Sequence, residues 1–556
     1  MRKKGDISPD EIFIESSNIS QFNTSQFEGR LEKPISKKTF TGISILLVII
    51  FTIFSGRLWY LQVQKGEAYS EISENNRLNH VPVFAERGVI FDRNGERLSW
   101  NVPNQENDDF SLRQYTDTAG LAHILGYVSH PAKDSSGFYY QYYFEGKDGA
   151  ERVFDESLKG TNGIKISETD AHGGILSESV IENPEPGENI YLSIDSRVQN
   201  KLYTTMRDLA QEVGFSGGAG VIMDVETGEL IALTSYPEYD MQAFSLGDDA
   251  ELIGKTLNNE KMPLLNRATL GIYTPGSIVK PFMAIAALNE EVINPQKEIL
   301  STGRMIVPNP YNPDEPSVFN DWKAHGYVDM YKALAVSSNV YFYQIGGGFE
   351  GQQGIGIVNI NKYMRMFGFG EKTGIELKSE EYGVIPSPEW KEENFEDGTW
   401  RVGDTYNTSI GQYGFQVTPI QVVRAVAAVA NNGVVFNPTI LKSDGSTSNI
   451  DHVVDIPRNY FEEVRKGMRQ AVEEGTAQGI SVPYIRLAGK TGTAEVGTQK
   501  KRVNAWITGF FPYENPRYAF TVVMEQGPSD NLLGGVFVMR TMLDWMRDNT
   551  PEYLDL

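Results

Sequence analysis

Residues 273–282 read YTPGSIVKPF, and FMAIAALNEE over 282–291 continues them with strong helix formers. Ser277 and Lys280 are three residues apart, so a helix would place both on one face, within reach of each other. Pro281 is tolerated only near a helix start, where backbone N–H groups lack partners. Ser277 is therefore predicted beside the positive end of a helix dipole. The combination predicts an activated serine nucleophile, with a capping serine and a solvated lysine as the alternative.

The sequence on either side of this helix predicts an α+β domain. ENIYLSIDSRVQNKLYTTMRDLAQEVG, from residue 188, starts as a strand and continues as a long helix, as expected where a new domain begins. GAGVIMDVETGELIALTSYP, from residue 218, predicts two strands around a Thr-Gly turn. Farther on, predicted helices over 418–431 and 460–474 precede a strand over 519–524. We expect one domain over 188–556, with strands grouped at both ends and helices between them.

The composition excludes several classes of function. A net charge of −23 argues against a nucleic-acid partner, because binding phosphates needs clustered Lys and Arg. The absence of cysteine excludes a disulfide, a thiolate zinc site and a cysteine nucleophile. The histidines are scattered, without H-x-x-x-H spacing. We therefore expect neither a metal site nor a cofactor.

An uncharged segment near the N-terminus predicts a membrane anchor. TFTGISILLVIIFTIFSG, residues 39–56, suits a single spanning helix, for which roughly 20 residues are needed. Lys33, Lys37 and Lys38 precede it, which places the N-terminus in the cytoplasm. A cleaved signal peptide is the alternative, but the hydrophilic lead is long and FSGRLWY is a poor cleavage site. We expect a disordered cytoplasmic tail over 1–38, a helix over 39–61 across the cell (inner) membrane, and an extracytoplasmic remainder.

A small irregular module is expected between the anchor and the large domain, over 62–187. ERGVIFDRNGERLSW, residues 86–100, predicts two short strands around the turn Asp92–Gly95. Polar loops, aromatic residues and many glycines follow it.

A Ser–Lys acyl-transfer site would also require S-x-N and K-T-G motifs. Ser337–Asn339 is the favoured S-x-N copy, because it lies between the other two motifs at the end of a short apolar helix, although helix capping alone would also explain it. The copy at Ser529–Asn531 follows a strand and is typical of a loop with a helix cap. Two further copies lie in the tail and in the small module, at Ser16–Asn18 and Ser99–Asn101.

The K-T-G motif occurs twice. Lys372–Gly374 lies in FGFGEKTGIEL, a glycine-flanked loop without a second threonine. Lys490, Thr491, Gly492 and Thr493 lie between YIRLAG and AEV, which predicts a strand edge where the glycine permits close backbone approach. An edge strand can bind a peptide-like substrate by strand addition, and the lysine offers a positive charge to a carboxylate. We therefore favour the second copy.

Together, these motifs resemble those of the class B penicillin-binding proteins, which are monofunctional peptidoglycan D,D-transpeptidases. The resemblance covers nearly everything after residue 55 and includes NRATLGIYTPGSIVKPF, AVSSNVYFY, GQYGFQVTPIQ and AGKTGTAE. RGVIFDRNG and DGAERVFDESLKGTNG resemble the dimerisation-type pedestal of that family, in which Arg87, Gly88, Asp92, Arg93 and Gly95 form a structural motif. The implied fold is the α+β penicillin-binding and serine β-lactamase-like domain, an antiparallel sheet with helices packed on it.

By this resemblance, Lys280 acts as a neutral base beside the cationic Lys490 and takes the proton from Ser277. Ser277 attacks the penultimate D-Ala carbonyl of a D-Ala-D-Ala donor stem peptide, and an amine of a second stem peptide accepts the acyl group. Ser337 relays the proton to the leaving amine, and Asn339 holds the acyl chain and Lys280. Lys490, Thr491 and Thr493 bind the terminal carboxylate, and the backbone N–H groups of Ser277 and Thr493 form the oxyanion hole. The expected site comprises Ser277, Lys280, Ser337, Asn339 and Lys490, with Thr491, Gly492 and Thr493 binding substrate; β-lactams are the expected inhibitors.

The chain departs from the family pattern in one respect. Where members often carry a sizeable head subdomain, about twenty residues remain between LSWNVP and GLAHILGYV. The resemblance implies a SEDS-type glycan polymerase as a partner, bound through the membrane helix and the pedestal, and the short head puts the manner of docking in doubt. FNDWKAHGYVDMYKALAVSSN resembles elongation-type more than division-type members. Some elongation-type relatives bind zinc near this stretch through a cysteine, which is missing here, so His325 is expected to be a structural histidine.

Two other readings remain open. A D,D-carboxypeptidase or a β-lactamase-like hydrolase would carry the same three motifs and use water as the acceptor. A non-catalytic scaffold or a β-lactam sensor would bind the drug without turnover.

Overall fold

The computed structural model describes residues 37–65, 78–105, 108–135, 139–169, 175–309, 312, 314–443, 445, 448–497, 501–531 and 533–555. The chain divides into two compact units, one comprising residues 1–80 and 166–179 and the other 81–165 and 180–556. Residues 1–36 of the predicted cytoplasmic tail lie outside the described residues.

The first unit contains helix α1 (Lys37–Trp59), which continues as a π-helical turn over Tyr60–Gln64. Among the described residues, 40–64 form the one helix that is long and apolar enough to cross a membrane, with a mean hydropathy of 2.0. The first unit's residues 78–80, 166–169 and 175–179 are parts of the strands β1 (Leu78–Val83), β9 (Gly163–Thr169) and β10 (Ile175–Glu182), which form a three-stranded sheet in that order. The helix lies where the uncharged segment predicts it.

We call the second unit's residues before 192 the small module and the rest the large module. A four-stranded sheet has the order β11 (Ile190–Tyr191), β2 (Ile90–Phe91), β3 (Arg97–Val102) and β4 (Leu112–Tyr115). The small module also contains β5 (Val128–Ser129) paired with β8 (Glu145–Gly146), β6 (Ala132–Lys133) paired with β7 (Tyr139–Gln141), and helices α3 (Ala122–Leu125), α4 (Gly149–Val153) and α5 (Asp155–Leu158).

The predicted turn at Asp92–Gly95 joins β2 to β3 and links the two modules. The Asp92 carboxylate accepts hydrogen bonds from the backbone N–H of Asn94 at 2.8 Å and from the hydroxyl of Ser196 at 2.7 Å. Arg93 pairs with Glu229 of the large module at 3.3 Å. The turn therefore fixes the start of the large module, in addition to closing a hairpin.

A five-stranded antiparallel sheet lies at the centre of the large module. Its order is β13 (Leu230–Tyr236), β12 (Gly217–Asp224), β22 (Tyr518–Pro528), β21 (Arg502–Phe511) and β20 (Ala488–Val496). Its strands come from the two ends of the module, as predicted. β20, which carries the favoured K-T-G motif, is an edge strand of this sheet.

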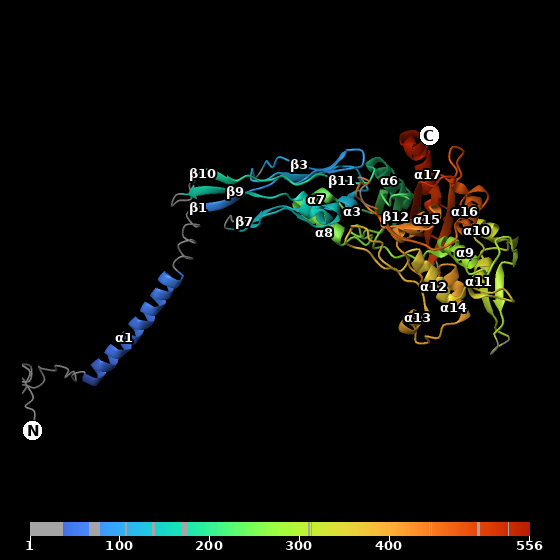
Figure 1. Ribbon diagram of the computed structural model, residues 1–556, viewed down its shortest axis with the longest axis horizontal. Coiled ribbons are helices and arrows are strands. Elements are labelled where there is room, and N and C mark those ends of the chain that lie inside the picture. Colours follow the sequence, from blue (N-terminus) through green and yellow to red (C-terminus); the bar gives the residue numbers. More distant parts are fainter. Residues whose placement is uncertain are drawn as a thin grey trace, which may run out of the picture. The chain divides into compact units, whose positions relative to one another are not determined.

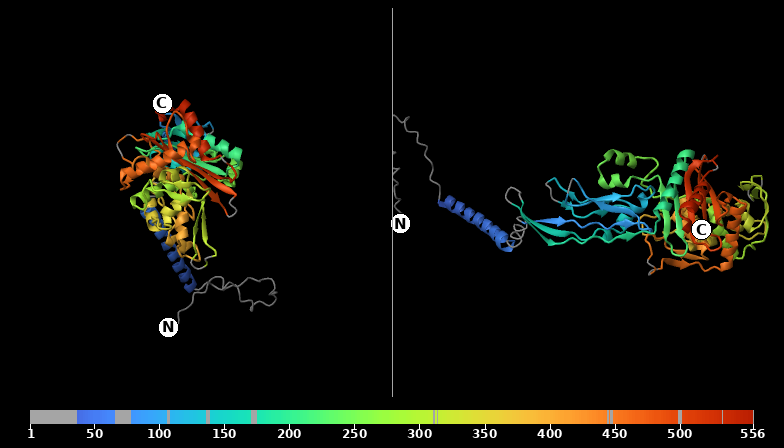
Figure 2. Two further views of the ribbon diagram at one scale, coloured as in Figure 1. Left: turned by 90° about the vertical axis from the view of Figure 1, so that its right-hand side faces the viewer. Right: turned by 90° about the horizontal axis from the view of Figure 1, so that it is seen from above.

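Helices cover both faces of the central sheet (Figures 1 and 2). α6 (Ser196–Val213) and α17 (Gly535–Asn549) pack on one face, and α15 (Pro419–Ala430) packs on the other. Alternation along β12 explains this arrangement, because Ile222 joins the core of α6 and α17, whereas Val221 and Met223 join the core of α15 and α9 (Lys280–Asn289). The predicted α+β class, an antiparallel sheet with helices packed on it, is confirmed.

The large module contains further elements, of which α7 packs against β4 and β5 of the small module. They are helices α7 (Met241–Leu246), α8 (Ala250–Leu257), α10 (Met330–Ala335), α11 (Asn339–Gly347), α12 (Ile357–Met366), α13 (Pro388–Asn394), α14 (Val402–Ser409) and α16 (Arg458–Glu473), strand pairs β14 (Ile299–Ser301) with β17 (Gly326–Val328), β15 (Arg304–Val307) with β16 (Ser317–Asn320) and β18 (Val434–Phe436) with β19 (Ile450–Val453), and 3-10 turns at Gly276–Val279, Gln478–Ile480 and Pro551–Tyr553.

Candidate active site

Ser277 lies in the 3-10 turn Gly276–Val279, and the α-helix itself begins at Lys280, with Pro281 in its first turn. The serine thus lies at the N-terminal end of the helix, as the sequence predicts. The turn is held from outside, because the backbone N–H of Gly276 donates to the carbonyl of Gly411 at 3.0 Å. Gly276 has φ +55°, and a Cβ there would lie 3.1 Å from the carbonyl oxygen of Thr493. Glycine thus allows the serine turn to approach β20 closely.

Lys280 is fully buried, and its ammonium contacts both ends of the favoured S-x-N motif. Its Nζ donates to the carbonyl of Ser337 at 2.9 Å and to Oδ1 of Asn339 at 2.7 Å, and it lies 3.3 Å from Oγ of Ser337. Burial lowers the pKa of Lys280 to about 7, although the charge of Asp321 acts in the opposite direction. This amine can therefore exchange a proton near neutral pH.

The S-x-N segment is a tight turn between α10 and α11. Ser337 has φ +58°, which is unusual for a residue with a Cβ. The middle residue, Ser338, is the N-cap of α11 and accepts a hydrogen bond from the N–H of Tyr341. Ser337 and Asn339 therefore face Lys280, whereas the Ser338 side chain bonds to Tyr341 and Asp321.

On the edge strand β20, the lysine side chain is buried, whereas the two threonine side chains are at least partly exposed. Lys490 is fully buried, and its Nζ donates to the carbonyl of Thr491 at 2.9 Å. Burial, and then the charge of Lys280, lower the pKa of Lys490. Thr493 is exposed, and Thr491 is half-buried and donates to the hydroxyl of Thr476 at 2.6 Å. A Cβ on Gly492 would lie 2.8 Å from the carbonyl of Pro275, which explains the glycine.

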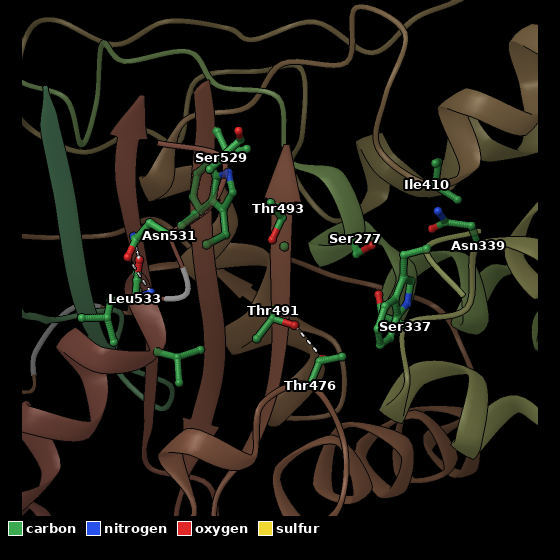
Figure 3. A pocket seen from close by; sticks show the side chains of 18 of the residues that line it. Ser277, Ser337, Asn339, Ile410, Thr476, Thr491, Thr493, Ser529, Asn531 and Leu533 are labelled. Atoms are coloured by element: carbon green, nitrogen blue, oxygen red, sulfur yellow. Dashed lines mark hydrogen bonds between the residues drawn. The ribbon is translucent and has the colours of Figure 1, made fainter. Parts of the chain in front are cut away.

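These elements line one cleft of about 470 Å³. Figure 3 shows Ser277 between Thr493 of the edge strand and Ser337, with Ser529 and Asn531 on the other side of that strand. Among the described residues, no acidic side chain lines the cleft, and Lys280 and Lys490 are buried behind its lining. The lining residues are Ser277, Trp322, Ser337, Asn339, Ile410, Gln412, Thr476, Thr491, Gly492, Thr493, Val503, Ala505, Trp506, Ser529, Asn531, Leu533, Gly534, Gly535 and Val536.

The rejected motif copies have different surroundings. In the loop with Lys372, the backbone N–H and the hydroxyl of Thr373 both donate to Glu380, at 2.8 and 2.6 Å. That copy is therefore a structural turn. Asn531 accepts from the N–H of Leu533 at 3.0 Å, as expected for a loop, but Ser529 and Asn531 also line the cleft. Their position at the cleft was not predicted from the sequence.

Sequence motifs did not identify three other residues at the site. Thr476 meets Thr491, Trp322 lines the cleft, and Asp321 lies behind Asn339 and acts on Lys280 by its charge. They belong to no short motif, since their roles depend on tertiary packing.

His325 is the histidine that the sequence assigned a structural role. Its side chain is nearly buried, and its Nε2 lies 3.6 Å from Oδ1 of Asp321. Within the described residues, no group of three or more His, Cys, Asp or Glu side chains is arranged to hold a metal.

Comparison with known families identifies the fold and the chemistry. The model of the penicillin-binding protein transpeptidase domain matches residues 218–536, which contain the whole cleft. The chain belongs to this family. The model of the penicillin-binding protein dimerisation domain matches residues 106–192 of the same chain. The resemblance to class B members and the prediction of a serine-type D,D-transpeptidase are confirmed.

Relatives of known name support the same assignment. The peptidoglycan D,D-transpeptidase MrdA of Acinetobacter baumannii is 29% identical over 580 residues, covering 87% of this chain and 84% of the relative. Penicillin-binding protein 2 of Pseudomonas aeruginosa, solved in complex with WCK 5153, is 30% identical with a TM-score of 0.69, covering 85% of this chain and 98% of that one. The Helicobacter pylori protein of the same name, solved in complex with MreC, is 28% identical with a TM-score of 0.69, covering 85% and 99%.

Replacing the two K-T-G lysines by alanine should distinguish the copies. Lys490→Ala removes a buried ammonium, and we expect the rate of penicillin acylation to fall about 10- to 150-fold, because a hydrogen bond to a charged group contributes about 1.5–3 kcal/mol. Lys372→Ala should leave the rate near that of the wild type, since Thr373 and not the lysine binds Glu380. Stopped-flow acylation of the full-length protein in detergent measures both. Similar losses in the two variants, or a larger loss at Lys372, would reverse the assignment.

Proposed function

We propose that this transpeptidase cross-links peptidoglycan stem peptides through an acyl-enzyme on Ser277. The observation that carries the proposal is the buried amine of Lys280, one helical turn from Ser277 and hydrogen-bonded to Ser337 and Asn339. A neutral amine at that position can accept the proton of the Ser277 hydroxyl while its oxygen attacks a carbonyl carbon.

The reaction has two halves. The Ser277 oxygen bonds to the penultimate D-Ala carbonyl carbon, the peptide bond to the terminal D-Ala breaks, and the proton passes from Lys280 through the Ser337 hydroxyl to the departing amine. An amine of a second stem peptide then attacks the ester and gives up a proton by the reverse route. The cross-link forms, and Ser277 is regenerated. Asn339 keeps Lys280 in place during both halves.

The edge of β20 suits recognition of the donor peptide. An edge strand has backbone groups free to pair with an extended peptide, as in strand addition. Thr491 and Thr493 offer hydroxyl groups to the terminal carboxylate, and Lys490 acts from behind the strand through its charge. A bound carboxylate would favour the charged form of Lys490, and that charge would in turn favour neutral Lys280. The N–H groups of Ser277 and Thr493 would stabilise the oxyanion, at about 3 kcal/mol per donor.

The membrane topology and the partners extend this proposal. Lys33, Lys37 and Lys38 precede the apolar segment and favour a cytoplasmic N-terminus. We propose a single span over 39–61, a pedestal over 62–187 and an extracytoplasmic transpeptidase domain over 188–556. The Helicobacter pylori relative forms a complex with MreC. We propose that α1 and the pedestal likewise bind cell-wall assembly proteins, including a SEDS-type glycan polymerase.

Incubation of the full-length protein in detergent with a fluorescent penicillin tests the proposed function. We expect one covalent adduct per molecule, mapped to Ser277 by peptide mass spectrometry and released over hours, because no acidic side chain among the described residues of the cleft is placed to activate a water. An adduct on another residue, or none, would contradict the proposal. Release within seconds would support a β-lactamase-like hydrolase, and loss of D-Ala from a stem peptide without cross-linking would support a carboxypeptidase.

A further inference from the structure

Asp321 is a buried carboxylate that the mechanism above does not use. Its side chain is fully buried, and Oδ2 accepts hydrogen bonds from the hydroxyl of Ser338 at 2.8 Å, the backbone N–H of Val340 at 3.1 Å and the hydroxyl of Ser301 at 3.1 Å. Ser338 and Val340 lie on either side of Asn339. One carboxylate thus holds the segment that begins α11.

Trp322 holds the segment that precedes Ser337. Its indole N–H donates to the carbonyl of Val336 at 3.1 Å, and its backbone N–H donates to Oδ1 of Asp321 at 2.9 Å. The indole lines the cleft and remains 55% exposed. The position of an exposed indole is therefore fixed by a hydrogen bond to the chain just before Ser337.

These contacts surround a backbone conformation that Ser337 would not adopt by itself. A φ of +58° is disfavoured for a residue with a Cβ and persists only where its surroundings impose it. The same conformation directs the Ser337 carbonyl to Nζ of Lys280, at 2.9 Å. Fixing the turn therefore also fixes the amine.

We propose that Asp321 and Trp322 form a clamp that holds the Ser337–Asn339 turn against Lys280, with both acting as positioning residues for the acylation step. The proposal rests on the function assigned to Ser277 and Lys280. It assigns roles to two residues that lie outside the three motifs.

The charge of the clamp gives it a second effect. Asp321 raises the pKa of Lys280, whereas burial lowers it, and Lys280 in turn lowers the pKa of Asp321. Two other titratable groups face this pair. Lys490 approaches Lys280 from β20, and His325 lies beside Asp321. General base catalysis requires neutral Lys280, so acylation should rise with pH through about 7. Removing the negative charge should lower the pKa of Lys280 and move this rise to lower pH.

The test compares pH profiles of penicillin acylation for full-length Asp321→Asn, Trp322→Phe and the wild type. For Asp321→Asn we expect the rate above the rise to fall about tenfold and the midpoint to move to lower pH by about one unit, the size typical of a nearby opposite charge. Trp322→Phe keeps an aromatic side chain and leaves the charge of Asp321 in place, but it lacks the indole N–H. We expect its rate to fall about 2- to 10-fold with the midpoint unchanged.

Asp329→Asn is the matched control, because Asp329 caps the adjacent helix α10 through the N–H of Lys332, whereas the carboxylate whose charge acts on Lys280 is Asp321. It should reproduce the wild-type profile. If Asp321→Asn keeps the wild-type midpoint, or if Trp322→Phe acylates at the wild-type rate, the clamp is wrong. Should Asp321→Asn not fold, Ser338→Ala and Trp322→Phe decide, since the first removes the hydroxyl bond to Asp321 together with the N-cap of α11, the second removes the indole bond to Val336, and both should slow acylation. Absence of acylation in the wild type would instead refute the proposed function.

Discussion

Ser277→Ala is expected to abolish the covalent penicillin adduct. The hydroxyl of Ser277 is the nucleophile of the proposed mechanism, and removing a catalytic serine costs about a millionfold in rate. The surrounding turn should survive, because it is held by the backbone bond between Gly276 and Gly411. Intact-mass spectrometry after prolonged incubation measures the result, with circular dichroism to confirm folding.

Ser481→Ala provides the matched control for this loss. Ser481 is exposed and lies outside the cleft, so its variant should be labelled like the wild type. Persistence of a stoichiometric adduct in Ser277→Ala would show that another residue is the nucleophile. A variant that neither labels nor binds penicillin reversibly would indicate a damaged cleft, and the reversible affinity should therefore be measured alongside the mass.

Lys280→Met should slow acylation about 10²- to 10⁴-fold, the contribution of general base catalysis. Methionine fills a similar volume without an amine, so the fully buried position should tolerate it. The wild-type rate should rise with pH through about 7, because burial lowers the pKa of the Lys280 ammonium and only the neutral amine accepts a proton. The variant should lose this rise together with the rate. Stopped-flow acylation between pH 5 and 9 provides both measurements.

A second substitution at this position separates charge from proton transfer. Arginine in proteins effectively cannot be deprotonated, so Lys280→Arg should remain inactive, and raising the pH should not rescue it. Lys372→Met, at the rejected copy, should behave like the wild type. A Lys280→Met variant that retains the wild-type rate and pH profile would remove Lys280 from the role of base.

The sequence predicts the parts of the site that depend on local spacing. Ser277 and Lys280 are one turn apart on any helix, and the K-T-G-T segment alternates as an edge strand should, with Lys490 buried and Thr493 exposed. The exact start of the helix was not predicted. Gly276 adopts a left-handed φ against β20, and this contact favours a 3-10 turn before the α-helix.

The parts that the sequence did not predict depend on tertiary contacts between residues that share no motif. Asp321 reaches the S-x-N turn from a loop 17 residues before Ser338, and Thr476 meets Thr491 from the turn that follows α16. From the sequence, the segment Ser529–Asn531 was predicted only as a loop with a helix cap. Its place in the cleft follows from the neighbouring positions of β21, β22 and β20 in the sheet.

The pairing of β12 with β22 also determines when the cleft can form. The hydroxyl of Ser216 donates a hydrogen bond to the carbonyl of Glu525, 309 residues later in the chain. Of these two neighbouring strands, β12 is therefore synthesised early and β22 late. Contacts of such high sequence separation bear the entropy of closing a long loop before they contribute stability, and they fold slowly. A nascent chain that lacks 488–528 has the serine turn but no edge strand to face it. Penicillin reactivity is therefore acquired late, and a pulse of labelled drug during synthesis would report completion of the fold.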